Sequence, residues 1–433
     1  MSEPELIRVP ILTRVEGEGG LTIRLRGRTL EDVQLNIYEP PRLFESLLRG
    51  RPLEDVPDIT ARICGICPAA YQMSSVHALE RALEISVTPT IRRLRRLLYC
   101  GEWIESHSLH MHLLQAPDFF ALHSGMELAQ HAPQEVKRGL QLKKHGNRLL
   151  EVLGGRAIHP INVAVGGFHR LPRRDELADL IPDFEWGLQA AVEATRWVAG
   201  FSFPEFTGDY EFVAVTHPEE YPMNELHLRS STIGDIPLDD WRQHFQEEHV
   251  AHSTALHAVQ LPNRSSYFLG PLARVNLQRQ QLAPTARRLA DEIGFESPCR
   301  NPHRGIIARG LEVVHAYEEA LSILRDYHPK GPARLPYAPR AGIGAAATEA
   351  PRGTLYHRYE IDDEGRVVTA QIVAPTSQNQ RQIEADLRSF LKDRLTQVTA
   401  RDQLGRESEQ LVRTYDPCIS CSTHFLKIRW EEA

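Results

Sequence analysis

The sequence contains RICGIC at residues 62–67 and DPCISCSTH at residues 416–424. In both segments two residues separate the cysteines, which pair as Cys64 with Cys67 and Cys418 with Cys421. This spacing lets both sulfurs of a pair turn toward one ion, and Gly65 permits a tight turn in the first segment. Four converging thiolates would form a soft site suited to zinc, an iron–sulfur cluster or nickel. Such a site requires a fold that joins opposite ends of the chain.

The separation of the two pairs is unusual for a structural metal. Cys67 and Cys418 lie 351 positions apart, whereas structural zinc sites usually unite their pairs within roughly 15–20 residues. A zinc ion held by four cysteines is one interpretation, but it would add little to so large a core. A site joining the two chain ends is more typical of a functional centre. The spacing alone leaves both interpretations open.

The composition is that of a folded protein. The 433 residues are 42% hydrophobic and 25% charged, with a net charge of −7, so we expect a large core and no disorder. A nucleic-acid partner is not expected, because the most basic cluster, Arg92–Arg96, fits an exposed helix face. Apolar runs fall short of the ~20 residues that span a bilayer. The N-terminus is acidic rather than signal-like. We expect no membrane span and a cytoplasmic location.

Six cysteines in a long chain without a signal-like start do not indicate a disulfide framework. They suggest metal or redox chemistry at the two pairs. The remaining two, Cys100 and Cys299, are isolated in the sequence and are expected to be plain buried thiols.

Hydrophobic periodicity predicts a predominantly helical protein with small β elements, an α+β fold. Helices are expected at residues 134–153, 174–198, 281–293 and 301–327, and in a segment from about 79 that ends at Pro117. Strands are expected at 21–25, 33–37, 354–361 and 367–373, with an irregular β excursion between 203 and 241. We expect one domain over residues 1–433. It has a β-containing segment at about 1–60, a helical body at about 61–335 and a β/α segment at about 336–433.

The two cysteine segments closely resemble the signature motifs of nickel–iron hydrogenase large subunits, RxCGxC and DPCxxCxxH. Four further segments resemble that family in the same order: RVEGEGG at 14–20, RLFESLLRGR at 42–51, EAPRGTLYH at 349–357 and QIVAPTSQN at 371–379. Six segments in family order are specific, whereas one cysteine pair is not. The resemblance implies the large-subunit fold, a helical bundle core with β segments toward both ends, and H2 as substrate.

The resemblance also implies a bimetallic Ni–Fe(CN)2(CO) centre. Cys64 and Cys418 would bind nickel terminally, while Cys67 and Cys421 would bridge nickel to an iron bearing carbonyl and cyanide. Two residues would complete the cyanide pocket, Pro351 and Thr376. A second cation, Mg2+ or Fe2+, would be held by Glu45, the backbone carbonyl of Ile372, and His424.

Four polar residues take catalytic roles in this comparison. Glu16 would relay protons beside the terminal cysteine of the second pair, and Arg352 would lie over the open nickel position, oriented by Asp118 and Asp416. Heterolytic cleavage of H2 needs a Lewis acid and a nearby base, and a fixed guanidinium acts strongly in a dry pocket. Without the motifs, Glu16 fits an exposed helix-entry acid, Asp118 a cap and Arg352 a surface ion-pair partner.

The sequence departs from the family pattern at two positions. Tyr71 stands where the first motif often has histidine, and Glu18 stands where many members have histidine. We therefore expect a changed or missing hydrogen bond to Cys67 and a different proton exit path.

The partners follow from the cysteine count. The bimetallic site uses all four paired cysteines, so electrons must leave through an iron–sulfur small subunit. The compact length favours the branch whose flavin and iron–sulfur subunits exchange electrons with NAD(P), in some cases with sulfur reduction. Alternatives are a deazaflavin-linked or heterodisulfide-linked large subunit, a quinone-site subunit of the complex I type, which lacks the nickel cysteines, and a structural zinc protein.

Maturation factors are the last implied partners. In the family, nickel-insertion factors load the centre and a protease then removes a short C-terminal peptide at the histidine of the second motif. We expect active protein to end at His424, with residues 425–433 removed.

Overall fold

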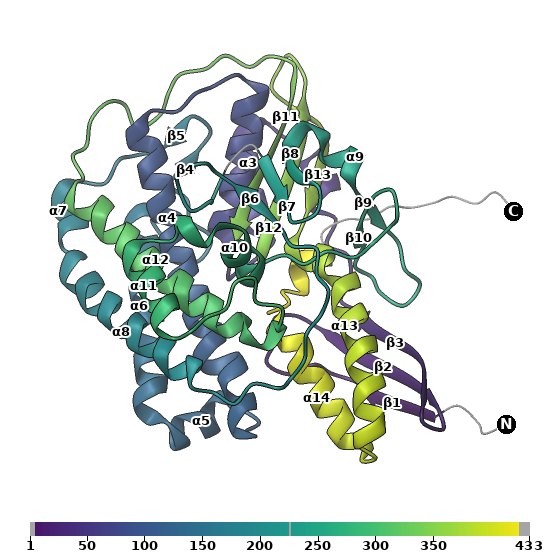
Figure 1. The fold of residues 1–433 in the computed structure, drawn as a ribbon. Coiled ribbons are helices and arrows are strands. Elements are labelled where there is room, and N and C mark those ends of the chain that lie inside the picture. Colours follow the sequence, from purple (N-terminus) through teal and green to yellow (C-terminus); the bar gives the residue numbers. More distant parts are fainter. Residues whose placement is uncertain (1–4, 225–226, 424–433) are drawn as a thin grey trace, which may run out of the picture.

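The structure is a computed structural model that describes residues 5–224 and 227–423. Its N-terminal strands β1 (Glu5–Val9), β2 (Gly19–Arg26) and β3 (Thr29–Ile37) form one antiparallel sheet (Figure 1). Apolar and polar residues alternate along these strands. Because successive side chains of a strand point to opposite faces, this alternation buries one face of the sheet. The strands predicted at 21–25 and 33–37 are confirmed.

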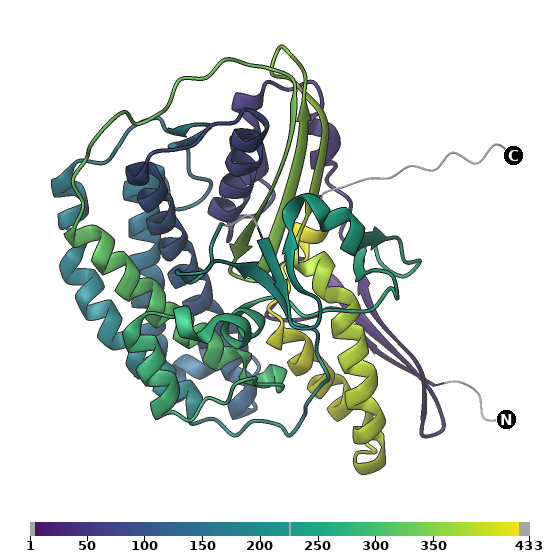
Figure 2. The same cartoon turned by 45° about the horizontal axis from the view of Figure 1, so that its top comes forward.

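Four long helices build the body of the protein: α4 (Pro89–Leu109), α6 (Pro133–Gly154), α8 (Ile181–Ala199) and α12 (Gly305–Arg325). They pack side by side in both ribbon views (Figures 1 and 2). Each turns an apolar stripe inward, and Leu311 and Val314 of α12 are fully buried. The predicted α+β class with a helical core is confirmed.

A second sheet supports the first cysteine segment. Strands β11 (Gly342–Ala350), β12 (Gly353–Ile361) and β13 (Val367–Val373) pair antiparallel in that order, and α3 (Pro68–Ala82) packs on β11 and β12. A Cβ added at Gly344 would lie 2.0 Å from the Ala78 carbonyl oxygen. Glycine therefore permits the close approach of strand and helix.

The C-terminal helices lie against the N-terminal sheet. Helix α13 (Pro375–Gln397) contacts β3, and α14 (Arg401–Thr414) contacts β1 (Figures 1 and 2). Segments from opposite ends of the chain are thus neighbours. The second cysteine segment begins directly after α14, at the junction between this unit and the helical body.

The remaining elements are short. The helices are α1 (Phe44–Leu48), α2 (Val56–Ala61), α5 (Gly125–His131), α7 (Arg174–Ala178), α9 (Trp241–His244), α10 (Pro271–Gln278) and α11 (Pro284–Glu292). The strands are β4 (Val163–Ala164), β5 (Gly167–Phe168), β6 (Val213–Thr216), β7 (His227–Ser230), β8 (Gly234–Pro237), β9 (Phe245–Glu248) and β10 (His257–Gln260). Strands β6 to β8 confirm the β excursion between 203 and 241.

Two predicted helices differ from the structure. The helix predicted at 174–198 is divided into α7 and α8, because Pro182 lies in the first turn of α8 and cannot continue a preceding helix. The segment from about 79 to Pro117 is interrupted between α3 and α4, and its end is not at Pro117, because a π-helical stretch at His110–Gln115 continues into a 3-10 helix at Ala116–Phe120. Pro117 has no N–H to continue the α-helical hydrogen bonds.

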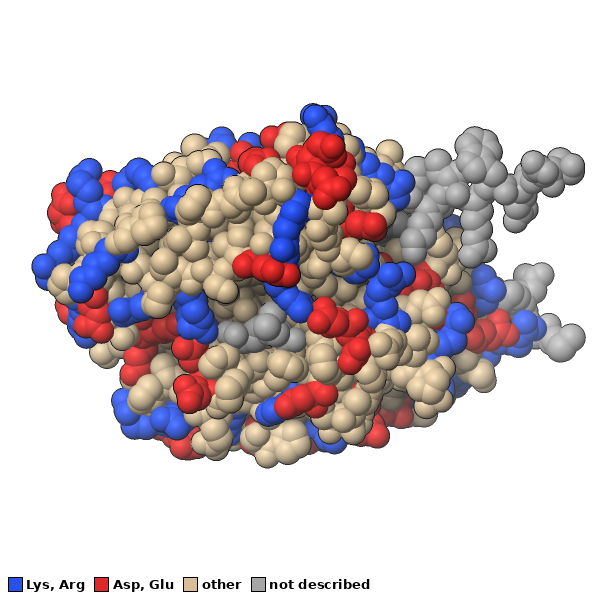
Figure 3. Space-filling view, turned by 90° about the horizontal axis from the view of Figure 1, so that it is seen from above, with Lys and Arg blue, Asp and Glu red and all other residues tan. Residues whose placement is uncertain are grey.

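Acidic and basic side chains are interspersed over the face of the molecule seen in Figure 3. Among the helices that the structure describes, none combines the length and apolar character needed to cross a membrane.

The contact between α4 and α6 gives a test of the fold. A Cβ at Gly146 would lie 2.6 Å from the Gly101 oxygen and 2.7 Å from the Glu105 nitrogen. We expect Gly146→Ala to lower stability by about 1–3 kcal/mol despite the better helix propensity of alanine, because two backbones must separate. The measurement is the urea midpoint of unfolding.

The matched control is Gly200→Ala at the end of α8, where the nearest atom to an added Cβ, the Trp197 oxygen, is 3.4 Å away. Equal midpoints for the two variants would show that the α4–α6 contact tolerates a methyl group.

Candidate metal centre

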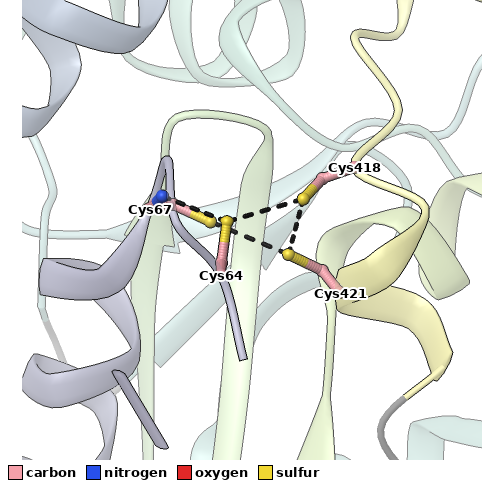
Figure 4. A group of neighbouring side chains, drawn as sticks. All are labelled: Cys64, Cys67, Cys418 and Cys421. Atoms are coloured by element: carbon pink, nitrogen blue, oxygen red, sulfur yellow. Dashed lines mark hydrogen bonds between the residues drawn. The ribbon is translucent and has the colours of Figure 1, made fainter. Parts of the chain in front are cut away.

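The four cysteines of the two segments meet in one buried cluster (Figure 4). The Cys64 and Cys418 sulfurs are 3.6 Å apart, those of Cys67 and Cys421 3.8 Å, and those of Cys418 and Cys421 2.6 Å. None of the four residues is more than 3% exposed. The fold therefore joins the two pairs into a single soft donor set.

The first pair sits in the turn between α2 and α3. The backbone N–H groups of Ile66 and Cys67 donate to the Cys64 sulfur at 3.3 and 3.1 Å. Cys67 directly precedes α3, which begins with Pro68. A helix N-terminus and two N–H donors favour negative charge, so this turn is suited to thiolates.

Glu16 lies beside the second pair. Its backbone pairs with Cys418 in a parallel β-bridge, and its carbonyl accepts from Ile419 N–H at 2.8 Å. The Glu16 carboxylate accepts from the Cys418 thiol at 3.0 Å and from Ser420 N–H at 3.1 Å. Thr376 lies beside the same pair, and its hydroxyl accepts a hydrogen bond from the Cys418 N–H at 3.0 Å.

The protons of the cluster are shared unevenly. Burial raises the pKa of Cys418 well above its usual value, and hydrogen bonding with the other three sulfurs adds to the rise. At Cys64 burial acts in the same direction. Hydrogen bonds from the other sulfurs and the charge of Arg352 outweigh it and hold the pKa of Cys64 well below its usual value. A bound metal replaces such protons, because it deprotonates coordinating thiols.

Arg352 places a fixed positive charge near the sulfurs. Its Nε donates to the Asp416 carbonyl at 2.8 Å and its Nη2 to the Asp416 carboxylate at 3.1 Å. Burial disfavours the charged form, but Asp416 and the cysteine thiolates outweigh burial and raise the pKa of the guanidinium. The buried Nη1 has no hydrogen-bond partner among the described residues.

Asp118 has a different role from the expected one. Its carboxylate pairs with Arg14 and accepts two hydrogen bonds of 2.9 Å from Arg413 on α14. Both oxygens are engaged by these arginines, so the expectation that Asp118 orients Arg352 is corrected. The sequence could not indicate this, since Arg14 and Arg413 come from distant segments.

Two of the residues expected at a second cation are adjacent. The Glu45 carboxylate accepts from Ile372 N–H at 2.7 Å, which joins α1 to β13. The third, His424, lies outside the described residues, as does the tail at 425–433.

A buried network around Arg274 of α10 was missed by sequence reasoning. Its guanidinium donates to both oxygens of Glu312 and to Glu349, each at 2.7 Å, and all three side chains are fully buried. It also donates to the carbonyls of Ala350 and Pro351, at 3.0 and 3.1 Å. Ala350 and Pro351 precede Arg352 in the APRG motif. The network therefore fixes the backbone that leads to Arg352. Glu349, Ala350 and Pro351 lie in a family-like segment, whereas Arg274 and Glu312 have no motif signal.

The residues present fit a nickel–iron centre. Four buried thiols match the preference of nickel and iron for soft ligands. Buried N–H groups nearly always have an acceptor, so the partnerless Nη1 of Arg352 indicates that a further acceptor belongs there.

A buried four-thiol centre that joins both chain ends in a helical body defines a metal-binding protein. The family model of the nickel-dependent hydrogenases matches residues 42–138 and 314–424. The chain is 34% identical to sulfhydrogenase 2 subunit alpha of Pyrococcus furiosus, over 98% of this chain and 100% of the relative. It is 26% identical to the NAD-reducing hydrogenase HoxS subunit beta of Cupriavidus necator, over 96% and 94%.

The fold is also similar to that of an NAD+-reducing [NiFe]-hydrogenase in the H2-reduced state. The TM-score is 0.87 at 24% identity, covering 97% of this chain and 99% of that one. The chain belongs to the nickel-dependent hydrogenase large-subunit family. It is a catalytic hydrogenase subunit, an oxidoreductase acting on H2, and its four cysteines are the site of a nickel–iron centre.

The Arg274 network gives a stability prediction. We expect Arg274→Met to lower the free energy of unfolding by about 3–5 kcal/mol, because Glu312 and Glu349 would keep buried charges without their partner. Urea unfolding measures the change. The control is Arg173→Met, whose partner Asp175 is exposed. A variant as stable as that control would contradict the bracing role.

Proposed function

We propose that this subunit cleaves H2 reversibly within an NAD(P)-linked hydrogenase. An iron–sulfur small subunit would carry the electrons to flavin and iron–sulfur subunits that react with NAD(P), and the assembly would also reduce sulfur. The observation that carries the proposal is the cluster itself, with a carboxylate on one sulfur and a guanidinium nearby. The similarity to sulfhydrogenase and NAD-reducing subunits supports the choice of acceptors.

In this proposal Cys64 and Cys418 would hold nickel, and Cys67 and Cys421 would hold both nickel and an iron with carbonyl and cyanide ligands. When bound, the centre supplies a Lewis acid and accepts the electrons of H2. Two residues line the cyanide side, Pro351 and Thr376.

The proton leaves through the carboxylate beside Cys418. Glu16 accepts from the Cys418 thiol and is therefore placed to take its proton. Ser420 holds two carboxylates in place on this side of the cluster, because its N–H donates to Glu16 and its hydroxyl to Glu39 at 3.0 Å. Glu39 is half-buried and so can exchange with water. The exposed Glu18 contributes its backbone N–H to Glu39, at 3.3 Å.

Arg352 acts as a fixed charge rather than as a base. Asp416 holds two of its nitrogens, and Nη1 remains to bind a ligand of the iron or to face H2. Because the guanidinium keeps its charge in a dry site, it stabilises negative charge that develops there.

Three further assignments belong to the proposal. Glu45, the Ile372 carbonyl and His424 bind Mg2+ or Fe2+, and the contact between Glu45 and Ile372 supports this grouping. Nickel-insertion factors and a protease that cuts at His424 complete the site. The enzyme works in the cytoplasm.

Metal content and infrared spectra of purified enzyme test the proposed centre. One nickel per chain is expected, together with the infrared stretches of carbonyl and cyanide ligands. Cys418→Ser should lose nickel and all H2 cleavage, because a hydroxyl is a poor ligand for a soft metal. Cys299→Ser should keep both, since its sulfur lies outside the cluster and donates to the Asn301 carbonyl. Zinc in place of nickel, or an active Cys418→Ser enzyme, would contradict the assignment.

Glu16→Gln tests the proton route. The amide keeps the shape and can still accept from Ser420, but it cannot carry a proton away. We expect hydrogen–deuterium exchange with solvent to fall by about 100-fold or more, with unchanged metal content and infrared bands. Glu18→Gln is the control, two residues away and exposed. Equal exchange rates in the two variants would show that protons leave elsewhere.

The acceptor is tested with the assembled complex. H2-dependent reduction of NAD+ or NADP+ supports the proposal. Reduction of a deazaflavin or a heterodisulfide instead would place the chain in the alternative branch.

A further inference from the structure

A second group of potential metal ligands lies outside the cysteine cluster. His252, His257 and Glu384 each offer one ligand atom, and these atoms all lie within 4.8 Å of one another. His257 is the first residue of β10, His252 lies in the loop from β9 to β10, and Glu384 is on α13. None of the three belongs to the cysteine cluster or to the expected second-cation site.

The His252 Nε2 and a Glu384 oxygen are 2.7 Å apart, and the His252 and His257 rings are 5.7 Å apart between centroids. An ion bonded to nitrogen and oxygen at about 2.0–2.1 Å separates neighbouring ligand atoms by about 3.4 Å. Side-chain rotations that move these ligand atoms by about 1 Å would therefore bring all three to metal-binding distances from one ion.

Two buried polar atoms at this place lack partners. The Nε2 of His257 and an oxygen of Glu248 have no hydrogen bond of normal geometry among the described residues, although His257 is only 1% exposed and the Gln380 side chain lies close to it. The two residues are directly opposite each other in the β9–β10 pair. Side chains at such positions lie on the same face of a hairpin. Unsatisfied buried atoms on one face indicate a missing ligand.

The backbone around the group is already fixed. Leu35 N–H of β3 donates to the Glu384 carboxylate at 2.9 Å, and the Asn36 side chain donates to the His252 carbonyl at 3.4 Å. Thr254 N–H donates to the Ile37 carbonyl at 2.8 Å. Three elements are therefore held in place before any ion binds, which reduces the entropic cost of binding.

The charge state also suits a cation. Burial, with the charges of His252 and Arg381, lowers the pKa of His257 to about 4. The imidazole is neutral at pH 7, the form that binds metals. The nearby cations have other partners, because Arg381 pairs with Glu248 and Arg388 with Asp32.

We propose that His252, His257 and Glu384 bind one divalent transition-metal ion of the Zn2+ type, with Glu248 as the neighbouring carboxylate. Two imidazoles and one carboxylate form a donor set that suits zinc, with room for water because His252 and Glu384 remain 21% and 14% exposed. The ion clamps the β9–β10 hairpin to α13.

This clamp would act close to the second cysteine segment. Ala255 of the same loop packs on Ile419, which lies between Cys418 and Ser420. Thr254 also donates to the Glu39 carbonyl at 2.8 Å. The ion thus stabilises one wall of the cysteine site without being part of it.

The test uses the assembled holoenzyme, in which nickel and iron already occupy the cysteines. Equilibrium titration with Zn2+ should show one saturable site per chain beyond the nickel and iron. We expect His257→Ala and Glu384→Gln each to weaken this binding by more than about 100-fold. Glu384→Gln guards against misfolding, because the amide oxygen can still accept from Leu35 N–H. The control is His227→Ala, an exposed histidine at the start of β7.

Two further readouts distinguish the site from surface binding. Saturating Zn2+ should raise the thermal midpoint of the wild type by about 3 °C, with no rise in Glu384→Gln. Co2+ should give weak visible bands of nitrogen and oxygen ligation rather than intense thiolate charge transfer. The absence of saturable binding in the wild type would overturn the proposal, as would equal binding in His227→Ala, His257→Ala and Glu384→Gln.

Discussion

The approach of Cys418 to Cys64, 3.6 Å between sulfurs, is the constraint on which the rest of the structure depends. It closes a loop of more than 350 residues, and the entropy of such closure must be offset by buried contacts. Arg42 provides some of them. Its backbone N–H donates to the Thr423 carbonyl at 2.6 Å, and its side chain donates to the carbonyls of Ile63 and Ser420. One arginine thus clamps both cysteine turns together.

Electrostatics then explains why the closed cluster needs a metal. Four thiolates in a dry interior would be costly, since buried charges require partners. Near the sulfurs Arg352 supplies one positive charge. The lack of further positive charge affects the thiols, and burial raises the pKa of Cys418 and of Cys421. Nickel and iron supply the missing positive charge, so metal binding and closure of the fold stabilise each other.

The sequence allowed prediction of those features that depend on local pattern. Alternating apolar residues located β3, and the paired cysteines with their flanking motifs identified the family and the centre. Contacts between segments that are distant in the chain could not be predicted from the sequence. The partners of Asp118 come from positions 14 and 413, and no spacing rule relates them. The close approach of Gly344 to the Ala78 carbonyl likewise appears only once α3 and β11 are packed.

The substitution at Tyr71 shows how such a departure is accommodated. The phenol is fully buried on α3, and its oxygen has no hydrogen-bond partner in the described part of the chain. The expected change at Cys67 is therefore a loss of the hydrogen bond that a histidine would make. Burial, and then the charges of the cysteine thiolates, raise the pKa of Tyr71 well above its usual value. A group that stays neutral cannot take protons from the cluster, whereas a histidine can titrate near neutral pH. A tyrosine at this position therefore agrees with the proposal that Glu16, which contacts Cys418 directly on the opposite pair, takes the proton.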